Sequence, residues 1–153
     1  MGADNGTVQV KPDQTPDENN WREFFERLPA SGWRCSVNNR FQAAPLGCDV
    51  YDLADLEGSE KDVLDLVMAK IRAKELVSFT LFPPKTDREM WAMYVSEYSK
   101  GTISFVTHDS YPVLEGTMVA DFSRGLAWIV PICFEAFGVF ELECHQYVDR
   151  ESR

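Results

Sequence analysis

The side chains that could catalyse proton transfer are few in this chain. Only two histidines are present, His108 and His145, so any histidine-dependent mechanism would have to use one of them. His108 stands beside Asp109 and Ser110, but adjacency in sequence does not make a catalytic triad, whose geometry is assembled from distant segments. We therefore expect His108 to lie in a loop and to face solvent.

The second histidine ends an alternation of polar and apolar residues. In a strand over residues 139–148, the side chains of Glu141, Glu143 and His145 would share one face, at steps of roughly 7 Å. Two carboxylates and an imidazole at that spacing could bind a metal ion or line a polar cleft. The alternative is that these side chains form the solvent-exposed face of a half-buried antiparallel strand, which is the commoner reason for this pattern.

Motifs that usually announce catalysis or cofactor binding are absent from the sequence. It contains no glycine-rich phosphate loop and no G-x-S-x-G nucleophile elbow. Its four cysteines include no C-x-x-C pair and have no secretory context, which favours free thiols over a zinc site or a disulfide. Cys133 and Cys144 stand in apolar sequence and are expected to be buried. We expect no cofactor and no enzymatic activity.

The strongest charge pattern lies between Cys48 and Val67, where seven acids accompany a single base, Lys61. The acids are Asp49, Asp52, Asp55, Glu57, Glu60, Asp62 and Asp65. Interleaved apolar residues would anchor the segment and display the carboxylates around one strand–loop–helix corner. Such a surface could occupy the basic cleft of a cationic protein. The alternative is that these acids cap a helix and aid solubility.

Two helices must position parts of this pattern. The segment Thr15–Glu18 matches a capping box with proline at the first helical position. A second helix is predicted to open at Ser59, with Asp62 as its capping partner and with Lys70 and Arg72 near its end, an order that suits the helix dipole. Both segments carry apolar residues at helical spacing. These are Trp21, Phe24, Phe25 and Leu28 in the first, and Leu64, Val67, Met68 and Ile71 in the second.

Most other apolar runs have the composition of strands. We predict strands over residues 33–37, 48–53, 77–82, 102–107, 117–122, 126–132 and 139–148. The tripeptide Ser123–Gly125 has the character of a hairpin turn, and Pro131 would require its strand to lie at a sheet edge. Residues 87–99 fit a helix or a strand, and the helix is favoured because a third capping box precedes its apolar residues.

These elements predict an α+β fold built as a single two-layer domain. The sheet would be antiparallel or mixed, with five or six strands and with two or three helices on one face. Residues 1–14 are polar and are expected to form a flexible N-terminal arm, leaving residues 15–153 for the domain. No apolar run approaches the ~20 residues of a membrane span, and no secretory signal is evident. We therefore expect a cytoplasmic protein that does not enter membranes.

The charge balance of the sequence limits the classes of partner that we expect. With 25 acids and 15 bases the formal net charge is −10, which argues against nucleic acid, because phosphate contacts need clustered lysine and arginine. We expect a non-catalytic protein-binding domain, possible examples being immunity or antitoxin proteins, whose acidic surface inhibits a basic partner such as a toxin domain by occluding it. One alternative is a small-molecule- or metal-binding protein or enzyme that uses the face of Glu141, Glu143 and His145. Another is an oligomeric scaffold joined through the edge strand at Pro131.

Overall fold

The computed structural model of the chain describes residues 6–48, 53–84, 93–98, 101–107, 114–117 and 119–146. Across these residues the chain forms an α+β fold, as predicted, with seven strands and three helices. The strands are β1 (Thr7–Pro12), β2 (Arg40–Ala43), β3 (Ala54–Glu57), β4 (Ser78–Leu81), β5 (Met93–Tyr98), β6 (Thr102–Thr107) and β7 (Phe140–His145). The helices are α1 (Glu18–Ser31), α2 (Glu60–Arg72) and α3 (Ser123–Phe137). The expected five or six strands were therefore too few.

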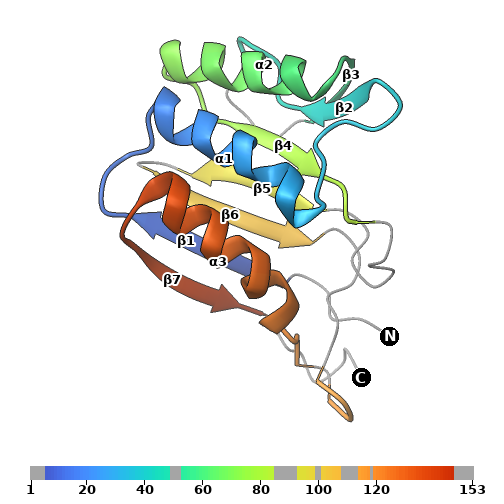
Figure 1. The fold of residues 1–153 in the computed structure, drawn as a ribbon, viewed down its shortest axis with the longest axis vertical. Helices are drawn as coiled ribbons and strands as arrows, with labels where there is room; N and C mark the ends of the chain where they lie inside the picture. Colours follow the sequence, from blue (N-terminus) through green and yellow to red (C-terminus); the bar gives the residue numbers. More distant parts are fainter. Residues whose placement is uncertain are drawn as a thin grey trace.

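The strands form one sheet in the order β3-β2-β4-β5-β6-β1-β7, and every neighbouring pair is antiparallel (Figure 1). Near its β3 end the sheet has one weakly paired junction, because β2 and β4 share a single registered residue pair, Ala43 with Phe79. The amide of Ala44 adds one hydrogen bond there, donated to the carbonyl of Ser78 at 3.0 Å. The hairpin of β2 and β3 is thus attached to the rest of the sheet by few main-chain contacts.

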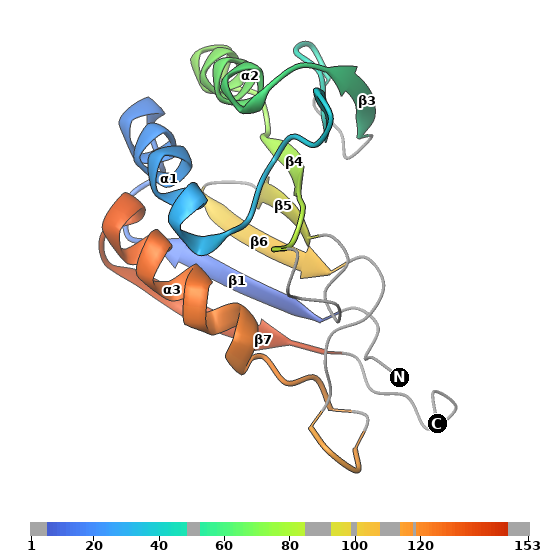
Figure 2. The ribbon, with the colours of Figure 1, turned by 45° about the vertical axis from the view of Figure 1, so that its right-hand side comes forward.

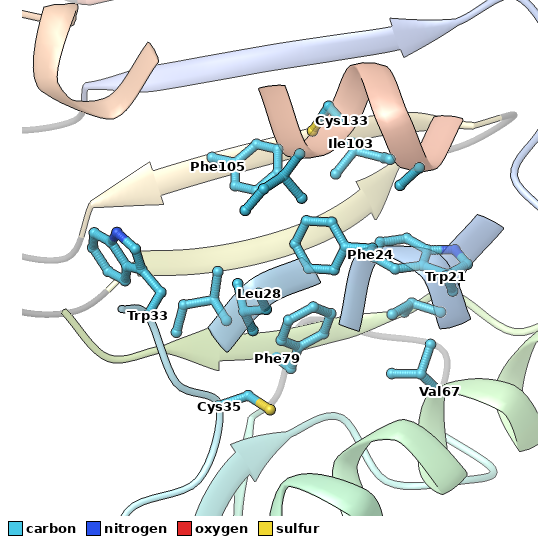
Figure 3. Close-up of a cluster of buried hydrophobic side chains, with 14 of the residues drawn as sticks. Trp21, Phe24, Leu28, Trp33, Cys35, Val67, Phe79, Ile103, Phe105 and Cys133 are labelled. Carbon is cyan, nitrogen blue, oxygen red and sulfur yellow. The ribbon is translucent and has the colours of Figure 1, made fainter. Parts of the chain in front are cut away.

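The three helices lie on the same side of the sheet (Figure 2). Between them and the strands is an aromatic core, in which Trp21 and Phe24 are fully buried (Figure 3). The ring of Trp21 meets the rings of Phe137 and Phe79 edge to face, with centroids 5.2 and 6.0 Å apart. The predicted core positions of Trp21 and Phe24 are confirmed, while Phe25 is half-buried against the same cluster. Large aromatic surfaces of this kind dominate the burial energy of a domain.

The helix starts follow local rules. The N-cap of α1 is Asp17 rather than Thr15, and its carboxylate accepts a hydrogen bond of 2.9 Å from the amide of Asn20. The Asn20 side chain accepts in return from the amide of Asp17 at 2.8 Å, which completes a capping box. In α2 the predicted partners are confirmed, since the Asp62 carboxylate accepts from the amide of Ser59 at 2.7 Å. Short polar side chains satisfy free helix amides in this way.

The prediction of a flexible arm over residues 1–14 is wrong for the residues of β1. This strand lies between β6 and β7, and its Val10 pairs with Ile103 on one side and Leu142 on the other. Val8 and Val10 are fully buried on the helix side of the sheet. The alternation that gives a strand is present in the sequence of β1, but it is too short to stand out against its polar surroundings.

The prediction of a strand over residues 126–132 is also wrong, because this segment belongs to α3. The supposed hairpin turn Ser123–Gly125 is the first turn of that helix, and Pro131 lies inside it. Pro131 therefore marks no edge strand, and the scaffold hypothesis loses its structural basis. The buried positions of α3 have helical spacing: Gly125, Ile129, Ile132, Cys133, Ala136 and Phe137. An apolar run rich in β-branched residues does not by itself distinguish a buried helix from a buried strand.

Residues 87–99, for which a helix was favoured, contain strand β5 at their end. Residues 85–92 lie outside the described residues, so the third capping box is not tested. Strand β5 pairs with β4 on one side and β6 on the other. This tertiary pairing explains why these residues form a strand although their aromatic residues have helical spacing.

Some of the remaining strand predictions are confirmed, and others differ from the structure. Strands β4, β6 and β7 confirm the predictions over 77–82, 102–107 and 139–148. The segment 33–37 contributes only isolated bridges, with Arg34 opposite Phe82 and Val37 opposite Arg40.

Other segments differ as well. Residues 49–52 lie outside the described residues, so the strand expected over 48–53 is tested only at Cys48 and Leu53, neither of which is in a strand. The next strand, β3, begins at Ala54. Residues 117–122 form no strand in the part of this segment that the structure describes.

Strand β2 was missed because the residues before it look like a loop. Asn38 and Asn39 both have positive φ, 53° and 58°, and they turn the chain between Val37 and Arg40. Two successive left-handed residues are the signature of a tight hairpin turn, which asparagine tolerates better than most residues. The Asn38–Asn39 pair was thus the available signal for a strand beginning at Arg40.

Candidate functional site

The acidic corner comprises the seven acids of the segment between Cys48 and Val67, and the structure divides the part that it describes. Asp49 and Asp52 lie outside the described residues. On β3, Asp55 and Glu57 are exposed, while the intervening Leu56 packs against the core on the helix side. These two carboxylates therefore lie on the sheet face that is turned away from the helices.

The other described acids of the corner are carried by α2, and Glu60, Asp62 and Asp65 are all exposed. Helix α2 packs through Val63 and Val67, which are buried. The acidic corner is thus two groups around the edge of the sheet, one on β3 and one on α2, and not a single flat face.

Glu60 has an internal role that sequence reasoning missed. Its carboxylate accepts hydrogen bonds from the amides of Cys35, at 3.1 Å, and Ser36, at 2.9 Å. The thiol of Cys35 also donates to Glu60. Burial raises the pKa of the Cys35 thiol, and the hydrogen bond to Glu60 raises it further. Glu60 therefore fastens the segment after α1 to the start of α2.

No carboxylate of the described part of the corner forms an ion pair. Five acids elsewhere in the described residues do so. They are Glu18 with Arg72, Glu23 and Glu135 with Arg27, Glu75 with Lys70, and Glu143 with Lys11. Glu60 and Asp62 accept hydrogen bonds from backbone amides, and Asp55 accepts one from the side-chain amide of Gln42 at 3.2 Å. The negative charge of the corner is thus left without a compensating cation among the described side chains.

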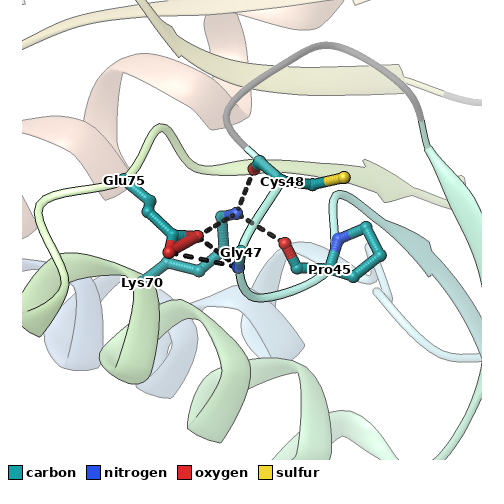
Figure 4. A network of polar contacts seen from close by, with 5 residues as sticks. All are labelled: Pro45, Gly47, Cys48, Lys70 and Glu75. Carbon is teal, nitrogen blue, oxygen red and sulfur yellow. Dashed lines mark hydrogen bonds and ion pairs between the residues drawn. The ribbon is translucent and has the colours of Figure 1, made fainter.

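Behind the corner, Lys70 is buried, with 1% of its surface exposed. Its ammonium group donates to the carbonyls of Pro45 and Cys48, at 2.9 and 2.7 Å, and lies 3.1 Å from the Glu75 carboxylate (Figure 4). The same carboxylate accepts from the amide of Gly47 at 2.7 Å. A buried ammonium needs all three donors satisfied. Lys70 is therefore a structural cation that holds the loop before residues 49–52, and not an exposed base at the helix end.

The polar face of β7 is exposed to water. The His145 ring lies 2.9 Å from Glu143, and Lys11 of β1 lies 3.2 Å from the same carboxylate. The hydrogen bonds from His145 and Lys11 lower the pKa of Glu143. In the described part of the chain, no three His, Cys, Asp or Glu side chains are grouped so as to hold a metal ion. Glu141, Glu143 and His145 thus form a strand face with local charge pairing.

Two grooves open between the helices. The groove between α1 and α3 has a volume of about 670 Å³, and Arg27 and Glu135 line it at an ion-pair distance of 3.5 Å. The groove between α1 and α2, of about 330 Å³, is lined by Trp33, Glu60 and Lys61 among others. Trp33 stacks on Trp128 of α3, with ring centroids 4.8 Å apart. Among the charged groups that line the grooves, Arg27 pairs with Glu23 and Glu135, and Glu60 accepts backbone hydrogen bonds.

The cysteines are free, as expected. Cys35 and Cys133 are buried, and burial raises the pKa of both thiols. Cys133 lies in α3 rather than in a strand, whereas Cys144 is exposed, which corrects the prediction that it is buried. A protonated, buried thiol is a poor nucleophile.

Comparisons with known protein families, with curated proteins and with solved structures found no match. In the part of the chain that the structure describes, no helix has the length and apolar character needed to cross a membrane. His108 lies outside the described residues.

Proposed function

We propose that this protein is a non-catalytic, cytoplasmic binding domain that recognises a basic protein partner through the acidic corner. One observation carries this proposal. The described acids of the corner have no ion pair with a lysine or an arginine, although five acids elsewhere in the fold do. Uncompensated carboxylates on an exposed edge attract cationic proteins and speed their association.

The hydrogen bonds within the corner indicate that some of its acids have a structural role and that others can contact a partner. Glu60 and Asp62 accept backbone hydrogen bonds and so give the corner its shape. Asp55, Glu57 and Asp65 accept no backbone hydrogen bond in the described structure, and they are available to a partner. A domain of this kind would inhibit a toxin-like partner by covering its basic surface, as an immunity protein does.

The test neutralises the available acids and spares the structural ones. The triple variant Asp55→Asn, Glu57→Gln, Asp65→Asn is compared with a control, Asp13→Asn, Glu26→Gln, Glu115→Gln, which removes the same charge elsewhere. A partner is first captured from the native cells on the immobilised protein and purified, and its affinity for each variant is then measured by calorimetry.

We expect the triple variant to bind at least tenfold more weakly, a loss of about 1.4 kcal/mol, while the control binds like the unaltered protein. Binding of the unaltered protein should also weaken as salt is added. Equal affinities for the two triple variants would refute the role of the corner.

A further inference from the structure

The second surface of interest is the free edge of β7, at the opposite end of the sheet from β3. In the described part of the chain, β7 pairs with β1 alone. The amide of Asp13 donates to the carbonyl of Val139 at 3.1 Å, and these two residues continue the β1–β7 register. Hydrogen-bonded and non-hydrogen-bonded pairs alternate along an antiparallel ladder. The main-chain groups of Glu141 and Glu143 therefore face β1, and those of Leu142 and Cys144 face outward.

The side chains along this edge are sorted by face. Leu142 pairs with the buried Val10, so it lies on the helix side of the sheet, yet 40% of its surface is exposed. Glu141 and Glu143 lie on the other side, with Lys11. A strand added here would meet apolar surface on one face and carboxylates on the other.

Helix α3 extends the apolar face. Phe134 of this helix does not line the groove toward α1, and it lies on the same side of the sheet as Leu142. Phe134 is 59% exposed. Exposed apolar residues that gather beside a free strand edge are typical of interaction sites.

We propose that the edge of β7 binds an extended segment of a partner protein in which basic and apolar residues alternate, and that this segment adds an eighth strand to the sheet. The main chain of this segment would pair with the outward main-chain groups of Leu142 and Cys144, as in strand addition generally. Its basic side chains would lie opposite Glu141 and Glu143, and its apolar side chains would cover Leu142.

Charge favours this occupant over a second copy of the chain. Two β7 strands related by a two-fold axis pair residues that lie on the same face. The two registers that pair most of the strand place Glu143 opposite itself or opposite Glu141. Like charges directly opposite each other destabilise a strand pair, and charged edges are a common protection against self-association.

The probe is a fluorescently labelled peptide of sequence KLKVKLK, compared with its acidic counterpart ELEVELE. The decisive variant is Cys144→Pro, because proline removes an outward amide and is tolerated at a free edge, while the pairing with β1 is kept. Its matched control, Cys144→Ala, keeps that amide. Binding is followed by fluorescence anisotropy, and hydrogen exchange measures protection of the amides of Leu142 and Cys144.

We expect the basic peptide to bind and to protect both amides, with at least tenfold weaker binding to Cys144→Pro than to Cys144→Ala. The triple variant of the acidic corner should bind the peptide like the unaltered protein, which separates this proposal from the proposed function. Equal binding to the two Cys144 variants, or equal binding of the acidic peptide, would overturn it. A dimer in light scattering whose Leu142 and Cys144 amides are protected without peptide would show that a second copy is the occupant, and would overturn it too.

Discussion

At one end of the sheet the edge strand β3 adjoins α2, and at the other end the edge strand β7 lies next to β1, near α3. Both edge strands carry two acids on the face away from the helices, Asp55 and Glu57 in β3 and Glu141 and Glu143 in β7. Around β3, the acids have no ion pair in the described structure, whereas Glu143 pairs with Lys11.

The two ends differ in what supports them. The β3 end depends on buried or shared polar contacts, since Lys70 and Glu60 fasten loops through backbone groups. The β7 end has exposed ion pairs and exposed apolar residues, and its strand pairs through six registered positions. The two edges thus have similar charge patterns but different support. Side-chain hydrogen bonds fasten the β3 end, whereas main-chain pairing with β1 holds β7. We therefore expect mutations of polar side chains to lower stability more at the β3 end than at the β7 end.

The largest effect is expected from Lys70→Met. The change leaves the Glu75 carboxylate and two carbonyls without their shared donor, and breaking a buried ion pair costs about 3–5 kcal/mol. Urea unfolding would measure the free energy of unfolding. The control, Lys61→Met, alters an exposed lysine of the same helix and should stay within about 0.5 kcal/mol of the unaltered protein. Equal losses for the two variants would mean that the Lys70 network does not support the β3 end.

An intermediate effect is expected from Glu60→Gln. Hydrogen bonds to a charged acceptor contribute about 1.5–3 kcal/mol, and glutamine keeps the size of the side chain while removing its charge. The amides of Cys35 and Ser36 should then exchange faster with solvent, as measured by NMR. Asp65→Asn, which removes a charge on the same helix, provides the comparison. If both variants leave these amides unchanged, Glu60 is only a surface acid.

The smallest effect is expected at β7, from the variant Lys11→Met, His145→Gln. Both residues favour the ionised form of Glu143, so removing them should raise the pKa of its carboxyl toward the ordinary value. A lowered pKa stabilises the folded state above the unfolded pKa, and this contribution is lost as the pH falls through the lower, folded pKa.

Carbon NMR of the Glu143 carboxyl during an acid titration would measure the midpoint before and after the change. A midpoint that does not move would show that the contacts of Glu143 with Lys11 and His145 are not formed in solution. Little change in the urea midpoint at neutral pH is expected, because ion pairs exposed to water contribute little to stability.

What could be predicted from the sequence was local. The helix starts near Asp17 and at Ser59 follow from capping residues a few positions apart, and the core roles of Trp21 and Phe24 follow from helical spacing. The absence of known catalytic motifs and the acidic balance are likewise readable in the chain itself.

Only the tertiary structure decided the elements whose partners are distant in sequence. The pairing of β1 with β6 and β7 turns a polar-looking N-terminal segment into an inner strand. The apolar run around Pro131 becomes a helix because it covers the sheet, and Lys70 is buried because loop carbonyls and Glu75 meet its ammonium group. Spacing along a chain records which residues share a face, but burial and pairing depend on contacts that close long loops, and those contacts decide between alternatives that are locally almost equal in free energy.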